Sequence, residues 1–272
     1  MTKVPVLISI PHGGWKVPDE LTDFWALSPE DAFHDGDPFT PQIFDFADRA
    51  VAQVTMEYFR AAIDLNRAPD DCAPENPDGV LKSLTCYDVA VYRDGFLPGA
   101  ELKQRLLDKY YTPYHRDLDE TFASGEVKLG IDCHSMAAIS PPNTGNPGEP
   151  RPLICLGNLG GADARVCPPH NRLSCEPELL EFMRDKFCEI FANEDVDIEI
   201  PAVATMNVPF EGGYITRRMG LHELPFVQIE MSRAVYLAKP YYDAENLTVD
   251  EARLTDLNHK IWSVIEATVR QL

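Results

Sequence analysis

"VKLGIDCHSM", residues 127–136, joins a short apolar run to an acid, a thiol and an imidazole at its end. The run predicts a buried strand over residues 127–132. At the end of such a strand, His134 could be a metal ligand, half of a nucleophilic pair with Cys133, or a histidine with only a structural role. Residues elsewhere in the chain are needed to separate these alternatives.

Similar short runs alternate with segments of helical periodicity along the 272 residues. Further strands are predicted at residues 6–10, 60–65, 152–157, 197–203 and 225–231, and helices at residues 41–57, 100–123, 177–192 and 249–272. We expect Pro113 to kink or break the second helix, and Ser174 to cap the third, with Pro177 in its first turn. This alternation predicts an α/β fold with helices on both faces of a sheet. No linker or internal repeat divides the chain, so one domain is expected over residues 1–272.

The chain is acidic, with 24 basic and 44 acidic residues and a formal net charge of −20. It lacks the basic footprint that a nucleic-acid partner needs, and it would be repelled by an anionic membrane surface. No run approaches the roughly 18 apolar residues of a membrane span, and the N-terminus lacks the features of a signal peptide. A cytoplasmic location is therefore expected. The seven cysteines include no CxxC pair, which argues against a disulfide framework or a four-cysteine zinc site.

Polar side chains occur at the ends of four predicted strands. The strands at 6–10, 60–65, 127–132 and 225–231 lead to or contain, respectively, His12, Asn66 with Arg67, His134, and Glu230. Because ligands of open α/β sheets bind at the carboxyl ends of the strands, we expect these side chains to lie close together.

Two histidines with one carboxylate are typical of a catalytic zinc site, which leaves a position for water. The carboxylate is expected from "FHDGDPFT", where one of Asp35 and Asp37 could bind metal while the other caps a helix. A Cys133–His134 nucleophilic pair is disfavoured, because adjacent residues of a strand point to opposite faces. We expect Cys133 in the core.

Glu230 lies within an apolar strand, where a charge is costly unless it is paired or functional. It could form a salt bridge with Arg233 or Arg218, or it could take a proton from a metal-activated water. Arg67, Arg217 and Arg218 could each grip a substrate carboxylate, or pair with a surface acid.

Seven motifs in order resemble the N-formylglutamate amidohydrolase (N-formylglutamate deformylase) family, over about residues 6–236. They are "SIPHGGWKVP", "DGDPFTPQIFDFA", "IDLNR", "YYTPYHRDL", "IDCHSM", "FEGGYITRRMG" and "VQIEMSR". The resemblance implies a fold similar to that of zinc carboxypeptidases and aspartoacylase: a three-layer α/β/α domain with a mixed, mostly parallel sheet. It also implies hydrolysis of an N-formyl or N-acyl amino acid with one bound Zn²⁺ per chain. Cobalt, iron or manganese could also occupy a site of two histidines and a carboxylate.

The resemblance also implies roles for individual residues. His12 and His134 correspond to the metal histidines, Asp35 is the preferred carboxylate ligand, and Glu230 corresponds to the general base. Asn66 and Arg67 are similar to the pair that holds a substrate carboxylate, and an arginine is expected to stabilise the charge on the reacting oxygen.

The leading substrate is N-formyl-L-glutamate, a small anionic N-acyl amino acid. Three alternatives are carboxypeptidase-like release of an acidic residue from a peptide, non-catalytic binding of an amino acid, and hydrolysis with Cys133 as nucleophile. Metal content separates a binding protein from a zinc enzyme. A cysteine hydrolase would be inactivated by a thiol alkylator and unaffected by a chelator.

Overall fold

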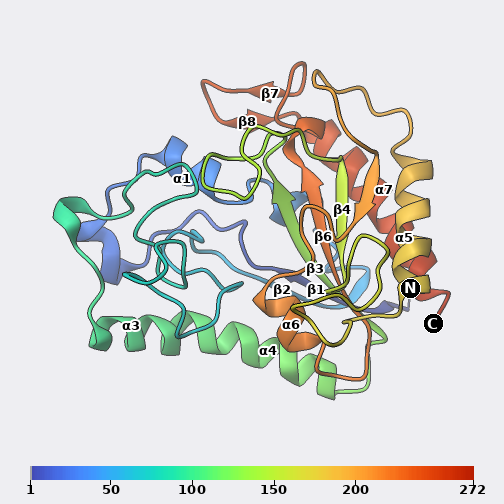
Figure 1. The fold of residues 1–272 in the computed structure, drawn as a ribbon, viewed down its shortest axis with the longest axis horizontal. Coiled ribbons are helices and arrows are strands. Elements are labelled where there is room, and N and C mark those ends of the chain that lie inside the picture. Colours follow the sequence, from blue (N-terminus) through green and yellow to red (C-terminus); the bar gives the residue numbers. More distant parts are fainter. Residues whose placement is uncertain (1) are drawn as a thin grey trace.

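A computed structural model describes residues 2–272, and its centre is one six-stranded sheet (Figure 1). The strands are β1 (Val4–Ile10), β2 (Ala50–Thr55), β3 (Leu129–Met136), β4 (Ile154–Gly157), β5 (Ala204–Met206) and β6 (Phe226–Ser232), in the spatial order β2-β1-β3-β6-β4-β5. All neighbouring strands are parallel except β4 and β6, which are antiparallel. The predicted mixed, mostly parallel sheet is confirmed.

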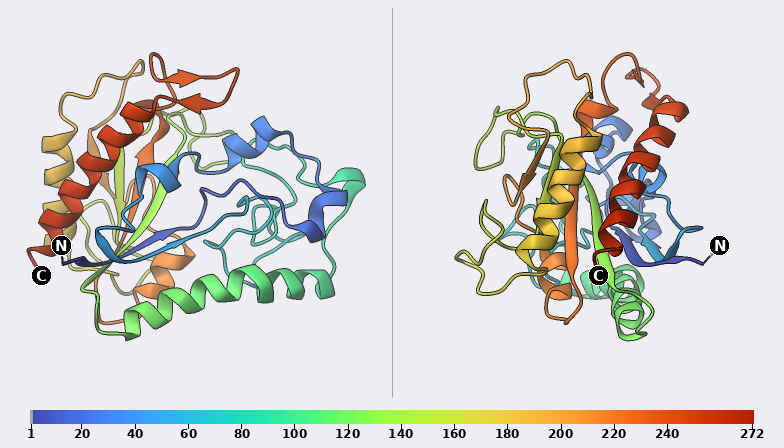
Figure 2. Two further views of the ribbon diagram at one scale, coloured as in Figure 1. Left: turned by 180° about the vertical axis from the view of Figure 1, so that it is seen from behind. Right: turned by 90° about the vertical axis from the view of Figure 1, so that its right-hand side faces the viewer.

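Helices cover both faces of this sheet. The α-helices of the described chain are α1 (Pro29–Asp35), α2 (Thr40–Ile43), α3 (Ala100–Leu106), α4 (Thr112–Ala123), α5 (Pro177–Ile190), α6 (Tyr214–Met219) and α7 (Glu251–Val269), of which α1 and α3 lie away from the sheet. Helices α5 and α7 lie side by side on one face, whereas α4 and α6 pack on the other (Figure 2). A small hairpin of β7 (Tyr242–Asp243) and β8 (Thr248–Val249) precedes α7. The three-layer arrangement is therefore also confirmed.

The two faces of the central strands differ in polarity because successive side chains of a strand alternate. On β3, Ile131 and Cys133 point into the apolar core that α5 and α7 cover. Asp132 and His134 belong to the other face, and all four residues are buried. Cys133 is thus a packing residue, as expected, and burial raises the pKa of its thiol well above the ordinary value.

The predicted helix at 100–123 runs through a π-helical turn, Leu107–Tyr111, between α3 and α4. Pro113, the second residue of α4, has no backbone N–H to continue the normal helical pattern, so the local widening before it replaces a break. The helix predicted at 177–192 begins at Pro177, as expected, but the Ser174 cap is wrong. The Ser174 hydroxyl instead donates to the carbonyl of Phe226 at 2.6 Å.

Two sequence predictions fail in the first third of the chain. The segment 41–57 is helical only as far as Ile43, after which it turns and forms β2 at the edge of the sheet. The segment 60–65 is a run of buried turns rather than a strand. Its backbone hydrogen bonds are partly local, since the amide of Ala62 donates to the carbonyl of Phe59. The amide of Asp64 donates to the carbonyl of Val80, in the loop that follows.

In the last third of the chain, one predicted strand lies later than expected and one predicted helix is confirmed. The strand predicted at 197–203 begins only at Ala204, and the helix predicted at 249–272 is α7. Within residues 2–272, none of the helices combines the length and the apolar character that crossing a bilayer requires.

Ile131 tests the central position of β3, because its side chain is fully buried. Ile131→Ala removes apolar contacts and leaves a cavity, so we expect the free energy of unfolding to fall by about 2–5 kcal/mol in urea titrations. Leu221, which is 66% exposed, provides the control; Leu221→Ala should change the free energy of unfolding by less than about 0.5 kcal/mol. Equal stability of the two variants would contradict the packing described.

Candidate metal centre and active-site cleft

His12 lies just beyond the end of β1, in a turn that depends on two glycines. A Cβ on Gly13 would lie 2.2 Å from Pro41 Cδ, and a Cβ on Gly14 would lie 2.3 Å from the carbonyl carbon of Glu57. Neither position has room for a side chain. The close approach brings the carbonyl of His12 to the amide of Asp37, which donates to it at 3.0 Å.

Three possible ligand atoms converge where this turn meets β3. His134 Nδ1 lies 3.1 Å from both His12 Nδ1 and Asp37 Oδ2, and His12 Nδ1 lies 3.4 Å from Asp37 Oδ2. All three side chains are buried. In a tetrahedral zinc site with bonds of about 2.0–2.1 Å, two ligand atoms are separated by about 3.3 Å. The spacing of the three atoms therefore fits a metal ion.

The second nitrogen of each ring is held by a buried aspartate. His12 Nε2–H donates to Asp64 Oδ1 at 2.8 Å, and His134 Nε2 lies 3.0 Å from Asp132 Oδ2. The hydrogen bond to Asp64 places the hydrogen of His12 on Nε2, and the charge of Asp132 favours the same tautomer in His134, so both Nδ1 lone pairs face each other and the Asp37 oxygen. Three acceptors without a donor between them repel one another, and either a bound proton or a metal cation relieves that repulsion. Aspartate partners of this kind also orient metal-binding histidines.

The charges of these three side chains also favour a bound cation. Burial favours a neutral ring, but the carboxylates of Asp132 and Asp37 outweigh it and hold the pKa of His134 well above its ordinary value. Although burial opposes ionisation of Asp37, the two imidazoles hold the pKa of its carboxyl well below its usual range. A site that attracts a proton this strongly also attracts a divalent cation, which competes with the proton.

Asp35, the carboxylate expected in this group, lies elsewhere. Its oxygens lie 3.2 and 3.1 Å from the ammonium of the buried Lys82, and the backbone amide of Cys86 donates to it at 3.2 Å. Asp37, the alternative, faces the imidazoles, and Arg233 holds its other oxygen at 3.2 Å. The preference for Asp35 is corrected to Asp37, because a buried lysine already neutralises Asp35.

Glu230 is buried beside this group, since it is the register partner of His134 across β3 and β6. Gln228 Nε2 donates to Glu230 Oε1 at 3.0 Å, and Gln228 Oε1 accepts from the amide of Gly213. Burial, together with the nearby Asp37 carboxylate, outweighs the His134 charge and raises the pKa of Glu230 to about 7. Neither Arg233 nor Arg218 forms an ion pair with Glu230 among residues 2–272.

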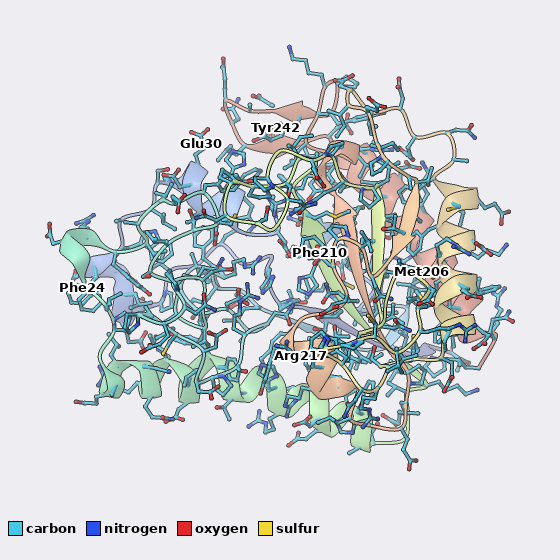
Figure 3. The ribbon with its side chains drawn as sticks, viewed as in Figure 1. Phe24, Glu30, Met206, Phe210, Arg217 and Tyr242 are labelled. Atoms are coloured by element: carbon cyan, nitrogen blue, oxygen red, sulfur yellow. The ribbon has the colours of Figure 1, made fainter. Side chains whose placement is uncertain are left out.

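A cleft of about 590 Å³ opens over the metal group and Glu230. Asn66 and Arg67 line it. Arg67 also forms a salt bridge with Asp78, in which Nη2 lies 2.6 Å from Oδ2. Arg217, on α6, is an exposed residue of the lining (Figure 3). Arg218 does not line the cleft; it pairs with Asp119 of α4, so its predicted contact with substrate is not supported by the structure.

Several polar residues of the cleft were not predicted from the sequence. Arg60 pairs with Asp64 at 2.7 Å, and Arg151 lies buried in the lining. Asp64 and Asp132 stand within the quoted "IDLNR" and "IDCHSM" motifs but were not assigned a role. Each of these aspartates lies in an apolar run, two residues before a predicted site residue (Asn66 or His134). That position was the signal in the sequence that could have identified them.

The fold and the cleft define a class of protein: an α/β enzyme whose polar residues gather at one end of a mostly parallel sheet, suited to hydrolysis. Residues 4–237 match the N-formylglutamate amidohydrolase family, and the chain belongs to that family. It is therefore an amidohydrolase that acts on a linear amide.

Two relatives and one crystal structure illustrate the similarity. The N-formylglutamate deformylase of Pseudomonas putida is 29% identical over 257 residues, which are 90% of this chain and 87% of the relative. That of Pseudomonas aeruginosa is 29% identical over 245 residues, 86% and 83% of the two chains. The fold is similar to that of N-formylglutamate amidohydrolase from Ralstonia eutropha, with a TM-score of 0.71 at 20% identity over 99% of this chain and 96% of that one.

Asp37 and Asp35 allow a paired test of the metal group. Asp37→Asn removes the charge of one candidate ligand, so the affinity for added zinc should fall by more than the roughly 10–100-fold that loss of an outer partner typically costs. Asp35→Asn should bind zinc as the wild type does, because Lys82 keeps Asp78 as a partner at 2.6 Å. Competition with a chelating dye measures both affinities. Normal zinc affinity in Asp37→Asn would remove Asp37 from the site.

Proposed function

We propose that the protein is a zinc-dependent deformylase that hydrolyses N-formyl-L-glutamate to L-glutamate and formate. The convergence of His12, Asp37 and His134 beside the buried Glu230 carries this proposal. Membership of the family and the names of the two relatives support the choice of substrate.

In this proposal His12, Asp37 and His134 hold the zinc ion. When bound, zinc supplies a Lewis acid that polarises the formyl carbonyl and makes water a nucleophile near neutral pH. Glu230 accepts the proton of the attacking water and then passes it to the amide nitrogen as the C–N bond breaks. Its buried position supports this role, because desolvation raises the basicity of a carboxylate.

Residues of the cleft wall would bind the substrate. Asn66 Nδ2 lies 3.5 Å from His134 Nε2, so Asn66 borders the metal group. We assign Asn66 and Arg67 to the α-carboxylate, which lies next to the reacting amide, and Arg67 also to the charge that develops on the carbonyl oxygen. Arg217, exposed at the cleft, would attract the incoming anion.

Formate release from N-formyl-L-glutamate tests the substrate and the metal together. We expect activity in the purified enzyme, loss of activity after chelation, and recovery when zinc is restored. Inactive protein with one equivalent of bound zinc would exclude this substrate and retain the metal site. Activity that chelation leaves unchanged, with no metal bound, would overturn zinc dependence.

Glu230→Gln tests the proton-transfer step. The amide cannot accept the proton, so kcat should fall by about 10²–10⁴-fold while bound zinc stays at one equivalent. Glu211→Gln is the matched control, because Glu211 lines the same cleft but pairs with His170 at 2.8 Å. Metal analysis and formate release measure the two properties. A Glu230→Gln enzyme as active as the control would exclude Glu230 as the base.

A further inference from the structure

Five arginines line the cleft, and they differ in what neutralises them. They are Arg60, Arg67, Arg151, Arg217 and Arg233. Three of them have a carboxylate partner: Asp64 for Arg60 at 2.7 Å, Asp78 for Arg67 at 2.6 Å, and Asp37 for Arg233 at 3.2 Å. Arg217 has none within residues 2–272, but its side chain is exposed to water. Arg151 differs from all four: it is only 4% exposed, and no ion pair neutralises it within the described chain.

Neutral groups alone hold the guanidinium of Arg151. Its Nη2 donates to Ser140 Oγ at 3.1 Å, and its Nη1 donates to the carbonyl of Ala137 at 3.4 Å. The guanidinium lies 4.9 Å from the centre of the Phe210 ring. Phe210 belongs to the loop that precedes α6 (Figure 3). Its Nε is buried and has no hydrogen-bond partner among residues 2–272. The side chain is therefore held in place with its buried Nε–H unused.

A buried cation without a counter-charge is costly, and an unused buried donor adds to that cost. Burial accordingly lowers the pKa of Arg151 from its ordinary value. Among residues 2–272, no hydrogen bond or ion pair joins it to the nearby carboxylate of Glu230, whose Oε1 accepts from Gln228. The arrangement suits an anion that arrives with the substrate, since Nε and Nη2 form one edge of the planar fork that carboxylates bind in a bidentate manner.

We propose that Arg151 binds the side-chain carboxylate of the acidic substrate and thereby sets the preference of the enzyme for acidic N-acyl amino acids. This inference rests on the proposed function, because an N-acylated glutamate carries two carboxylates that need two receptors. Asn66 borders His134 and is placed for the α-carboxylate near the reacting amide. Arg151 approaches from another wall, the segment between β3 and β4, and takes the second carboxylate.

The test compares substrates that differ only in this charge. Wild type and Arg151→Met are assayed on N-formyl-L-glutamate and N-formyl-L-glutamine, which have similar shapes. We expect kcat/KM for the glutamate substrate to fall by at least about 30-fold in the variant, as for loss of a buried charge pair. For the glutamine substrate it should change by less than about 3-fold, since an uncharged amide makes no ion pair. Arg184→Met on α5 removes the same charge outside the cleft, and should leave the preference unchanged.

Binding provides a readout that does not depend on turnover. Calorimetric titration of the zinc-loaded proteins with L-glutamate and L-glutamine should show a preference for glutamate in the wild type that Arg151→Met loses. This preference in a wild type that does not hydrolyse N-formyl-L-glutamate would reject the proposed function and keep the role of Arg151. Equal losses for both ligands and both substrates, or no preference in the wild type, would overturn the inference.

Arg151→Lys covers the case in which Arg151→Met does not fold. Lysine retains the charge but cannot donate a bidentate pair of hydrogen bonds or stack a planar guanidinium on the Phe210 ring. The preference for glutamate should fall at least about 5-fold, an intermediate loss. An unchanged preference in this variant would also overturn the inference.

Discussion

Two contacts between ring nitrogens and buried aspartates determine the arrangement of the candidate metal centre. Asp64 and Asp132 fix the Nε2 atoms of His12 and His134, so the Nδ1 atoms have to point at each other. The aspartates are themselves held: Asp132 accepts from the hydroxyl of Ser9 at 2.7 Å, and Asp64 accepts from the amide of Asn66 at 2.8 Å. Because Asp64, Asn66 and Arg60 all come from 60–67, the buried turns of this segment position the metal group and one wall of the cleft together.

The parts of the structure that follow from local sequence were predictable. In β3 and β6 the apolar residues alternate with polar ones, and this pattern alone assigns Cys133 to the core and His134 with Glu230 to the opposite face. A strand that is buried on both faces cannot hold such residues without a partner or a function. His12 follows the apolar run of β1 in a similar way. The two glycines after it indicate a tight turn, and the close contacts at both glycines show why the turn admits no side chain there.

The predictions that failed concern features that depend on contacts between residues far apart in the sequence. Asp35 and Asp37 are separated by one glycine, and their roles are decided by Lys82 and Arg233, which lie 47 and 196 positions away. Local spacing carries no information about such partners. The edge strand β2 pairs with β1 alone, and its run "AVAQVT" continues a helix-like pattern, so its conformation is settled by tertiary pairing rather than by propensity.

The charge of the whole molecule and the charge of the cleft have opposite consequences for an anionic substrate. A net charge of −20 repels it at a distance, yet the cleft is lined by six cationic and five acidic side chains. A divalent cation at the metal group would make that balance more positive. Surface charge is screened by salt beyond a Debye length of about 8 Å, whereas buried charges are screened far less. The repulsion therefore fades under physiological conditions, and the attraction inside the cleft remains. Most of the cleft's arginines are already paired with aspartates, so their charge orients the site, and the buried unpaired Arg151 is free to discriminate between ligands.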